Sequence, residues 1–150
     1  MKEIKTILVV DDMPLNLRTA KVMLEDFFVV LLAKSGEFAL SILRDETPVD
    51  LILLDIEMPN MNGFDFMEIL QTMPTAKDIP VIFVTSHVST GLVSHALHTG
   101  AKDYLAKPYK KEVLLKKIYT IIHETDKFYM TQEGKCILLS DETDETIQSQ

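Results

Sequence analysis

Residues 51–59 read LILLDIEMP, and this stretch decides the fold. Its four large apolar residues, 51–54, predict a strand that is buried on both faces, and such strands belong to parallel sheets covered by helices. Asp55 then stands at the carboxyl end of the strand, where open α/β sheets bind their ligands. A strand-end acid also commonly caps the next loop, so Asp55 alone does not establish a site.

Four further apolar segments have the length of strands. They are residues 6–10, 28–33, 81–85 and 103–106. The intervening segments predict five helices, which begin near Pro14, Ser35, Gly63, Thr90 and Lys110. Strands alternating with helices predict a doubly wound α/β sheet, and right-handed crossovers place helices on both of its faces. We expect a five-stranded parallel sheet in the order 2-1-3-4-5.

Apolar spacing predicts which helical side chains face the core. In chain order these are Leu15, Ala20, Val22, Met23, Phe27, Phe38, Ala39, Ile42, Leu43, Phe64, Met67, Ile69, Leu70, Val113, Leu114, Ile118, Ile121 and Ile122. We expect the third helix to continue to about Met73 and the last to about Glu124.

Composition limits the functional classes. With 150 residues, of which 47% are hydrophobic, the chain has enough apolar side chains for one ordinary domain. A net charge of −8 without a basic cluster argues against direct binding to nucleic acid. The single cysteine, Cys136, excludes an internal disulfide. No apolar run has the length of a membrane span or signal peptide, so we expect a cytoplasmic protein without membrane contact.

Three acids should meet at one edge of the predicted sheet. In the order 2-1-3-4-5, strands 6–10 and 51–55 flank the reversal point, so Asp11, Asp12 and Asp55 converge there. Their mutual repulsion is costly without a cation. An all-oxygen acidic site suits Mg²⁺, so the sequence predicts a magnesium site.

Two more polar residues end strands at the same edge, namely Thr85 and Lys107. Each has an ordinary explanation, because threonine often ends strands and a lysine before Pro108 is usually just exposed. Together with the acids they supply a nucleophilic carboxylate, a hydroxyl donor and a cation. Such a set matches phosphoryl transfer, where positioning and charge neutralisation do most of the work.

The ordered set of motifs resembles the receiver domain of two-component response regulators. The matching segments are Asp11-Asp12, Asp55 with Met58-Pro59 and Met61-Asn62-Gly63, Thr85, and residues 100–105 leading to Lys107-Pro108. The resemblance covers roughly residues 4–124 and implies a flavodoxin-like fold. The ordered set is far more specific than any one motif.

The resemblance implies a role for each matching residue. Asp55 would accept a phosphoryl group from a sensor histidine kinase or a His-containing phosphotransfer protein. Asp12 and the backbone carbonyl of Glu57 would join Asp55 as Mg²⁺ ligands, with Asp11 acting partly through water. Lys107 would pair with phosphoryl oxygens, and the peptide bond before Pro108 would be cis. The chain would not be an enzyme beyond its own phosphorylation and dephosphorylation, and any output enzyme domain is absent from it.

A switch is implied by the same resemblance. Thr85 would turn inward to donate to the phosphoryl group, and Tyr104 would follow. This movement would remodel the surface of segments 90–99, 103–106 and 110–124, through which we expect a homodimer; a monomer that binds a separate partner is the alternative. Tyr104 could equally be a half-buried edge aromatic without a switching role.

Two residues near the predicted site, Glu57 and His87, are less usual. They either alter the lifetime of the phosphoryl group on Asp55 or are solvated loop residues.

Beyond the receiver domain, 1–124, we expect an extension, 125–150. It has a small hairpin around Glu133-Gly134 and an acidic tail from Asp141, or it begins a truncated linker or output region.

Two other functions remain open. A hydrolase of the haloacid-dehalogenase kind also uses a strand-end Asp and Mg²⁺, but it requires a second Asp two residues after the nucleophile. Neither Asp11-Asp12-Met13 nor Asp55-Ile56-Glu57 meets that requirement, and the chain lacks room for a cap domain. A pseudo-receiver would bind partners without phosphorylation, and acid-labile phosphate on Asp55 distinguishes it from a receiver.

Overall fold

The structure is a computed structural model that describes residues 4–122, 127–130 and 136–139. Its chain divides into two compact units, Met1–Pro108 and Tyr109–Gln150. All the residues predicted to form the site lie in the first unit.

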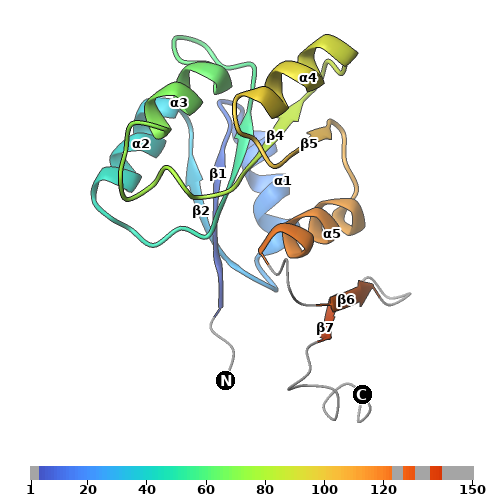
Figure 1. Ribbon diagram of the computed structural model, residues 1–150. Helices are drawn as coiled ribbons and strands as arrows, with labels where there is room; N and C mark the ends of the chain where they lie inside the picture. Colours follow the sequence, from blue (N-terminus) through green and yellow to red (C-terminus); the bar gives the residue numbers. More distant parts are fainter. Residues whose placement is uncertain (1–3, 123–126, 131–135, 140–150) are drawn as a thin grey trace. The chain divides into compact units, whose positions relative to one another are not determined.

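A five-stranded parallel sheet forms the centre of the first unit (Figure 1). Its strands are β1 (Thr6–Val10), β2 (Val29–Ala33), β3 (Leu51–Asp55), β4 (Val81–Thr85) and β5 (Asp103–Ala106). They are ordered β2-β1-β3-β4-β5, which confirms the predicted topology. Every residue of β3 and β4 is buried, as continuous apolar runs in a covered parallel sheet require.

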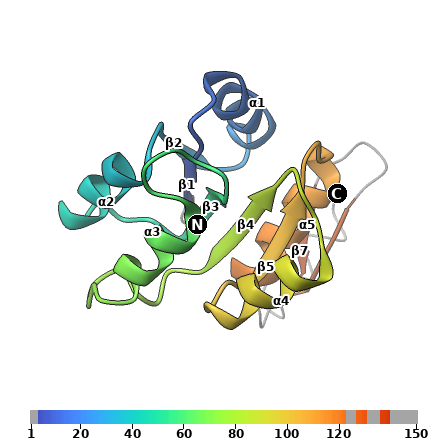
Figure 2. The same cartoon turned by 90° about the horizontal axis from the view of Figure 1, so that it is seen from above.

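Four helices of this unit connect the strands. They are α1 (Pro14–Leu24), α2 (Gly36–Arg44), α3 (Gly63–Leu70) and α4 (Thr90–His98). Seen from above, α1 lies on one face of the sheet and α2 and α3 lie on the other (Figure 2). The caps explain where the helices begin: the Ser35 hydroxyl accepts a hydrogen bond from the Phe38 N–H, and Asn62 and Asp65 form a reciprocal capping box.

Helix α3 ends three residues before the predicted end at Met73. After Leu70 the backbone tightens, because the N–H groups of Thr72 and Met73 donate to the carbonyls of Ile69 and Leu70, each three residues back. The Thr72 hydroxyl also donates to the Ile69 carbonyl, at 2.6 Å. Met73 nevertheless packs against the core, so its apolar character reflects burial in a turn and not helix.

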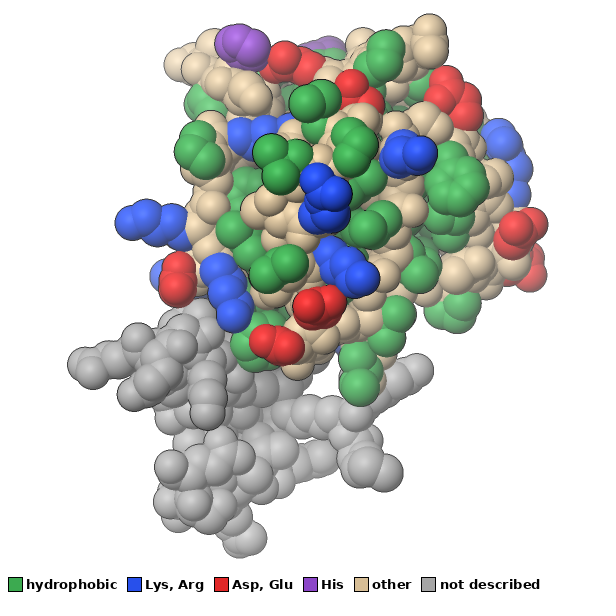
Figure 3. Space-filling view, turned by 180° about the vertical axis from the view of Figure 1, so that it is seen from behind, with side chains coloured by type: hydrophobic (Ala, Val, Ile, Leu, Met, Phe, Trp, Pro, Cys, Tyr) green, Lys and Arg blue, Asp and Glu red, His purple; other side chains and the backbone are tan. Residues whose placement is uncertain are grey.

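The predicted inner faces of two helices are partly wrong. Leu15 and Val22 of α1 are 62% and 66% exposed, and Phe38 of α2 is 54% exposed. The predicted Ala20, Ala39 and Leu43 are buried, and the other buried residues are Leu17 and Leu24 in α1 and Gly36 and Leu40 in α2. Helix α1 carries two apolar stripes at helical spacing, and the one with more members faces the sheet. The view from behind shows apolar side chains among Lys and Arg side chains on the surface (Figure 3).

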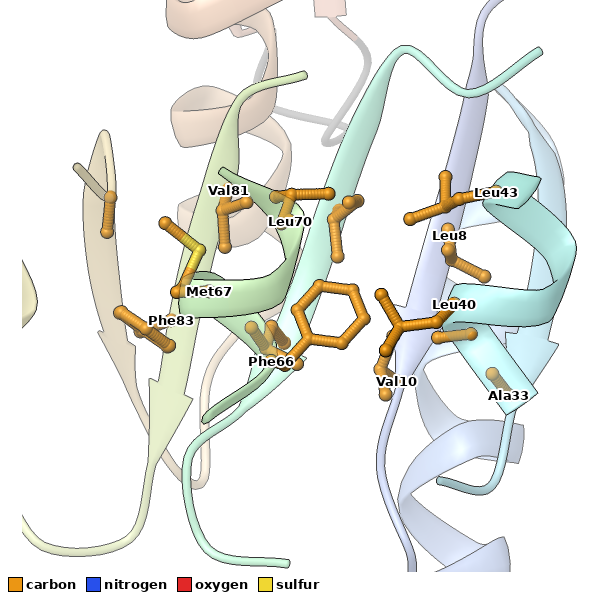
Figure 4. Close-up of a cluster of buried hydrophobic side chains, with 14 of the residues drawn as sticks. Leu8, Val10, Ala33, Leu40, Leu43, Phe66, Met67, Leu70, Val81 and Phe83 are labelled. Atoms are coloured by element: carbon orange, nitrogen blue, oxygen red, sulfur yellow. The ribbon is translucent and has the colours of Figure 1, made fainter. Parts of the chain in front are cut away.

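The main apolar cluster lies between the sheet and helices α2 and α3 (Figure 4). Leu8 and Val10 of β1 point into it beside Leu40 and Phe66. Phe66 is fully buried, whereas the predicted Phe64 and Ile69 are only half-buried. Successive strand residues point to opposite faces, so Ile7 and Val9 face the side of α1.

The second unit contains helix α5 (Lys111–Ile122) and the antiparallel pair β6 (Lys127–Met130) and β7 (Cys136–Leu139). Helix α5 buries Leu114, Leu115 and Ile118, while Val113, predicted to be inward, is 43% exposed. The expected turn at Glu133-Gly134 and the tail from Asp141 lie outside the described residues. Among the helices that the structure describes, none is long and apolar enough to cross a membrane.

Candidate functional site

Strand register brings the predicted site residues to one edge of the sheet. Val10 pairs with Leu54 and Thr85 pairs with Ala106, so the residues that follow these strands leave the sheet at the same edge. Asp55, the last residue of β3, pairs with Val84. This is the carboxyl edge, where the topology predicted the site.

Three carboxylates gather at this edge. Asp11, Asp12 and Asp55 each offer one oxygen, and these oxygens all lie within 4.8 Å of one another. Asp11 and Asp55 are both 4% exposed, and Asp12 is half-buried. This all-oxygen set can hold a metal ion, because hard cations such as Mg²⁺ prefer carboxylate ligands.

Asp11 is held by the first turn of α1. Its Oδ1 accepts hydrogen bonds from the Met13 N–H at 2.9 Å and from Asn16 Nδ2 at 3.3 Å. Asn16 is not among the predicted site residues. Its position five residues after Asp11, at the start of a predicted helix that leaves the same strand, was the available signal.

Lys107 joins two of the acids. Its Nζ lies 2.9 Å from Asp11 Oδ2 and 3.3 Å from Asp55 Oδ1, and the lysine side chain is only 17% exposed. The peptide bond between Lys107 and Pro108 is cis. One ammonium therefore faces two buried carboxylates and the nearby Asp12, which leaves the cluster with excess negative charge.

That excess appears in the pKa values. Burial, followed by the charge of Asp11, raises the pKa of Asp55 to about 6, although Lys107 and the Glu57 N–H act in the opposite direction. Burial disfavours the charged form of Lys107, but the hydrogen bond to Asp11 and the charges of both acids outweigh it and raise the lysine pKa. The donor set and this incomplete neutralisation both fit a divalent cation.

Thr85 is buried beside Asp55 and is hydrogen-bonded to its own loop. Its hydroxyl accepts from the His87 N–H at 3.0 Å, and it can donate to the His87 carbonyl at 3.2 Å or to Glu57 Oε1 at 3.4 Å. His87 Nδ1 lies 2.6 Å from Glu57 Oε1, with both side chains largely exposed. Glu57 and His87 thus contact each other at the entrance to the site.

Two further residues shape the surroundings. Tyr104 is half-buried and packs against the main apolar cluster. Gly63 begins α3 so close to the end of β3 that an added Cβ would lie 2.9 Å from the Asp55 carbonyl oxygen and from Ile56 Cα. Any side chain at position 63 would therefore press on the backbone that carries Asp55.

Comparison with known sequences identifies a family model and several relatives that match most of the chain. A family model described as the response regulator receiver domain matches residues 7–119. The chain is 41% identical over 110 residues to signal transduction histidine-protein kinase BarA of Escherichia coli, and the match covers 73% of this chain but 12% of BarA. It is 38% identical over 117 residues to protein PilH of Pseudomonas aeruginosa, a match covering 77% of this chain and 96% of PilH.

Solved structures agree with the sequence matches. Chemotaxis protein CheY4 of Vibrio cholerae superposes with a TM-score of 0.74 at 28% identity, covering 79% of this chain and 99% of that one. The receiver domain of a histidine kinase from Syntrophus aciditrophicus gives a TM-score of 0.72 at 30% identity, covering 81% of this chain and 92% of that one.

Proposed function

The chain belongs to the response regulator receiver family, and on that premise we propose that Asp55 accepts a phosphoryl group from a histidine kinase or a His-containing phosphotransfer protein. The observation that carries the proposal is the buried Asp55 carboxylate, 3.3 Å from the Lys107 ammonium in a cluster of three acids. A pKa of about 6 leaves Asp55 mostly ionised, and therefore nucleophilic, at neutral pH.

The proposed transfer forms one bond and breaks one. A carboxylate oxygen of Asp55 attacks the phosphorus, the bond between phosphorus and the donor imidazole nitrogen breaks, and the product is an acyl phosphate. Lys107 neutralises charge on the phosphoryl oxygens. Asp11, Asp12, Asp55 and the Glu57 carbonyl would hold Mg²⁺, which when bound supplies further positive charge to those oxygens.

The proposed response begins at Thr85. Its hydroxyl would exchange its bonds to the His87 backbone and Glu57 for a bond to the phosphoryl group, and Tyr104 would then reorient. Helix α4 buries only one residue, Ala96, so it is lightly held and suited to moving. We place the output surface, and a homodimer contact, on α4, β5 and α5.

The remaining assignments follow from this role. Residues 1–124 act as the receiver domain and residues 125–150 as an extension from it, in a cytoplasmic protein that meets its kinase there. The output of the whole protein belongs to the same proposal, since relatives such as BarA are much longer than the matched region. Family membership favours this function over the hydrolase alternative.

Mass spectrometry after borohydride trapping tests the proposal. The protein is incubated with Mg²⁺ and acetyl phosphate, and we expect a single label on Asp55. Asp55→Asn should take up no label, while the matched control Asp78→Asn, an exposed acid, should label like the parent. A folded parent that acquires no label would instead identify a pseudo-receiver, and label in Asp55→Asn would overturn the site assignment.

A further inference from the structure

A cavity lies at the edge of the sheet opposite to the acidic site. It has a volume of about 310 Å³. Its lining comes from the end of α2 and the segment before β3, and from the segment before β4: Leu43, Glu46, Thr47, Pro48, Val49, Thr75, Ala76 and Ile79. Strand β3 runs from this edge, at Leu51, to the carboxyl edge, at Asp55. The cavity is therefore separate from the acidic site and shares no lining residue with it.

The floor of the cavity is apolar and has a fixed shape. Leu43 and Ala76 are each 2% exposed and belong to the main apolar cluster. Val49 and Ile79 are half-buried and pack against that cluster. An apolar ligand body would thus meet a surface that the core already holds in place.

Glu46 at the rim breaks two local preferences. It follows the end of α2 with a φ of 58°, and its N–H donates to the Leu43 carbonyl at 3.0 Å, so it occupies the left-handed position that favours glycine. A carboxylate at a helix C-terminus is also unfavourable, because the helix dipole is negative there. Residues that break local preferences in this way cluster at functional sites.

The Glu46 side chain lines the cavity and is exposed to solvent. Within the part of the chain that the structure describes, Glu46 forms no ion pair. The cavity is also lined by Thr47 and Thr75, whose hydroxyls can hydrogen-bond a polar ligand group. The wall therefore combines one negative charge, two hydroxyls and an apolar floor.

We propose that this cavity binds a small alkylammonium ion. The ammonium group pairs with Glu46 and the alkyl stem lies on Leu43, Val49, Ala76 and Ile79. The volume of about 310 Å³ is at the small end of ligand sites, which limits the ligand to a short chain. This site does not depend on phosphoryl acceptance by Asp55, and either proposal can fail without the other.

NMR titration of the full chain tests the ligand class. Pentylammonium is added in saturating Mg²⁺, which occupies the acidic site, and amide shifts are followed. We expect saturable shifts centred on residues 43–49 and 75–79, with affinity rising about fourfold for each methylene from propyl to pentyl. Pentanol, which has the same stem without the charge, should bind about tenfold more weakly. Equal binding of pentanol, or shifts centred elsewhere, would overturn the proposal.

Two substitutions test the role of Glu46. Glu46→Gln keeps the size but removes the charge, and it should weaken pentylammonium binding about tenfold. Glu37→Gln, an exposed acid in the first turn of the same helix, is the matched control and should bind like the parent. Glu46→Gly should also lose binding but raise the melting temperature, because glycine relieves the left-handed backbone. Parent-like binding by both Glu46 variants would refute the site.

Discussion

The two kinds of burial in the first unit lie one residue apart on β3 and have opposite effects on stability. Leu54 belongs to the main apolar cluster and is fully buried, while Asp55 is 4% exposed among like charges. Burial of the cluster stabilises the fold. Burial of Asp55 opposes folding at neutral pH, as its raised pKa shows. The stability supplied by the apolar cluster thus offsets the cost of burying the Asp55 carboxylate away from water.

Removing a large side chain from the cluster should have the largest effect. Phe66 is fully buried, so Phe66→Ala should lower the free energy of unfolding by about 3–5 kcal/mol. Urea denaturation followed by circular dichroism measures the change. Phe38→Ala is the control, because Phe38 is 54% exposed, and it should change stability by less than about 1 kcal/mol. Equal losses in the two variants would show that the cluster is not the main source of stability.

Removing the cation of the site should have the next largest effect. Lys107→Met leaves Asp11 and Asp55 buried without their ammonium, so without Mg²⁺ the free energy of unfolding at pH 7.5 should fall by about 3 kcal/mol. Part of the loss should be recovered at pH 5, where Asp55 is protonated. The control is the exposed Lys102→Met, which we expect to match the parent. A loss that is the same at both pH values would contradict the charge explanation.

Removing the charge of Asp55 should have the opposite sign. Asp55→Asn keeps the shape and removes a buried carboxylate whose pKa is raised from 3.8 to about 6. Without Mg²⁺ at pH 7.5, the free energy of unfolding should therefore rise by up to about 3 kcal/mol. Thermal unfolding monitors the change, and the exposed Asp78→Asn serves as the control. A clear loss of stability in Asp55→Asn would mean that its pairing with Lys107 outweighs its burial.

The pH dependence should isolate the contribution of this proton. The folded state holds the Asp55 proton more tightly than the unfolded state, so the contribution is fully present below about pH 3.8 and is lost as the pH rises through about 6. In that window the parent should lose up to about 1.4 kcal/mol per pH unit relative to Asp55→Asn. Denaturation of both proteins at half-unit steps measures the difference. Parallel curves would refute the raised pKa.

The exposed contact between His87 and Glu57 should matter least for stability. His87→Ala and Glu57→Gln break a contact between largely exposed side chains, so each should change the free energy of unfolding by less than about 1 kcal/mol. A double-mutant cycle measures the coupling between them. A coupling free energy well above about 1 kcal/mol would show that these two residues interact as strongly as the buried charged groups of the site do.

Sequence patterns were sufficient for the sheet and for the edge that carries the site. The continuous apolar runs of β3 and β4, alternating with helical segments, favour a covered parallel sheet. The topology then brings Asp11, Asp55 and Lys107 together. Helix faces were less certain, because Leu15 and Val22 have the same helical spacing as the buried stripe of α1. Packing against the sheet selects one stripe, and one helix's sequence does not contain that information.

Contacts between side chains in the loops also could not be predicted from the sequence. The contact of His87 with Glu57 depends on the path of two loops from different strands, and residue types do not define that path. The bond from Asn16 to Asp11 depends on how the first turn of α1 returns toward β1. The convergence of the three acids was predictable, because Asp11 and Asp12 come immediately after β1 and Asp55 is the last residue of β3.

Gly63 limits how this chain can diverge over evolutionary time. Every missense change in a glycine codon introduces a Cβ, and at position 63 that atom would meet backbone 2.9 Å away at the Asp55 carbonyl. At Gly91 no atom lies within 4 Å of the added Cβ, so the same class of mutation is sterically free. We therefore expect substitution to be sterically tolerated at Gly91 and to displace the backbone at Asp55 when it occurs at Gly63, although neither glycine carries a reactive group.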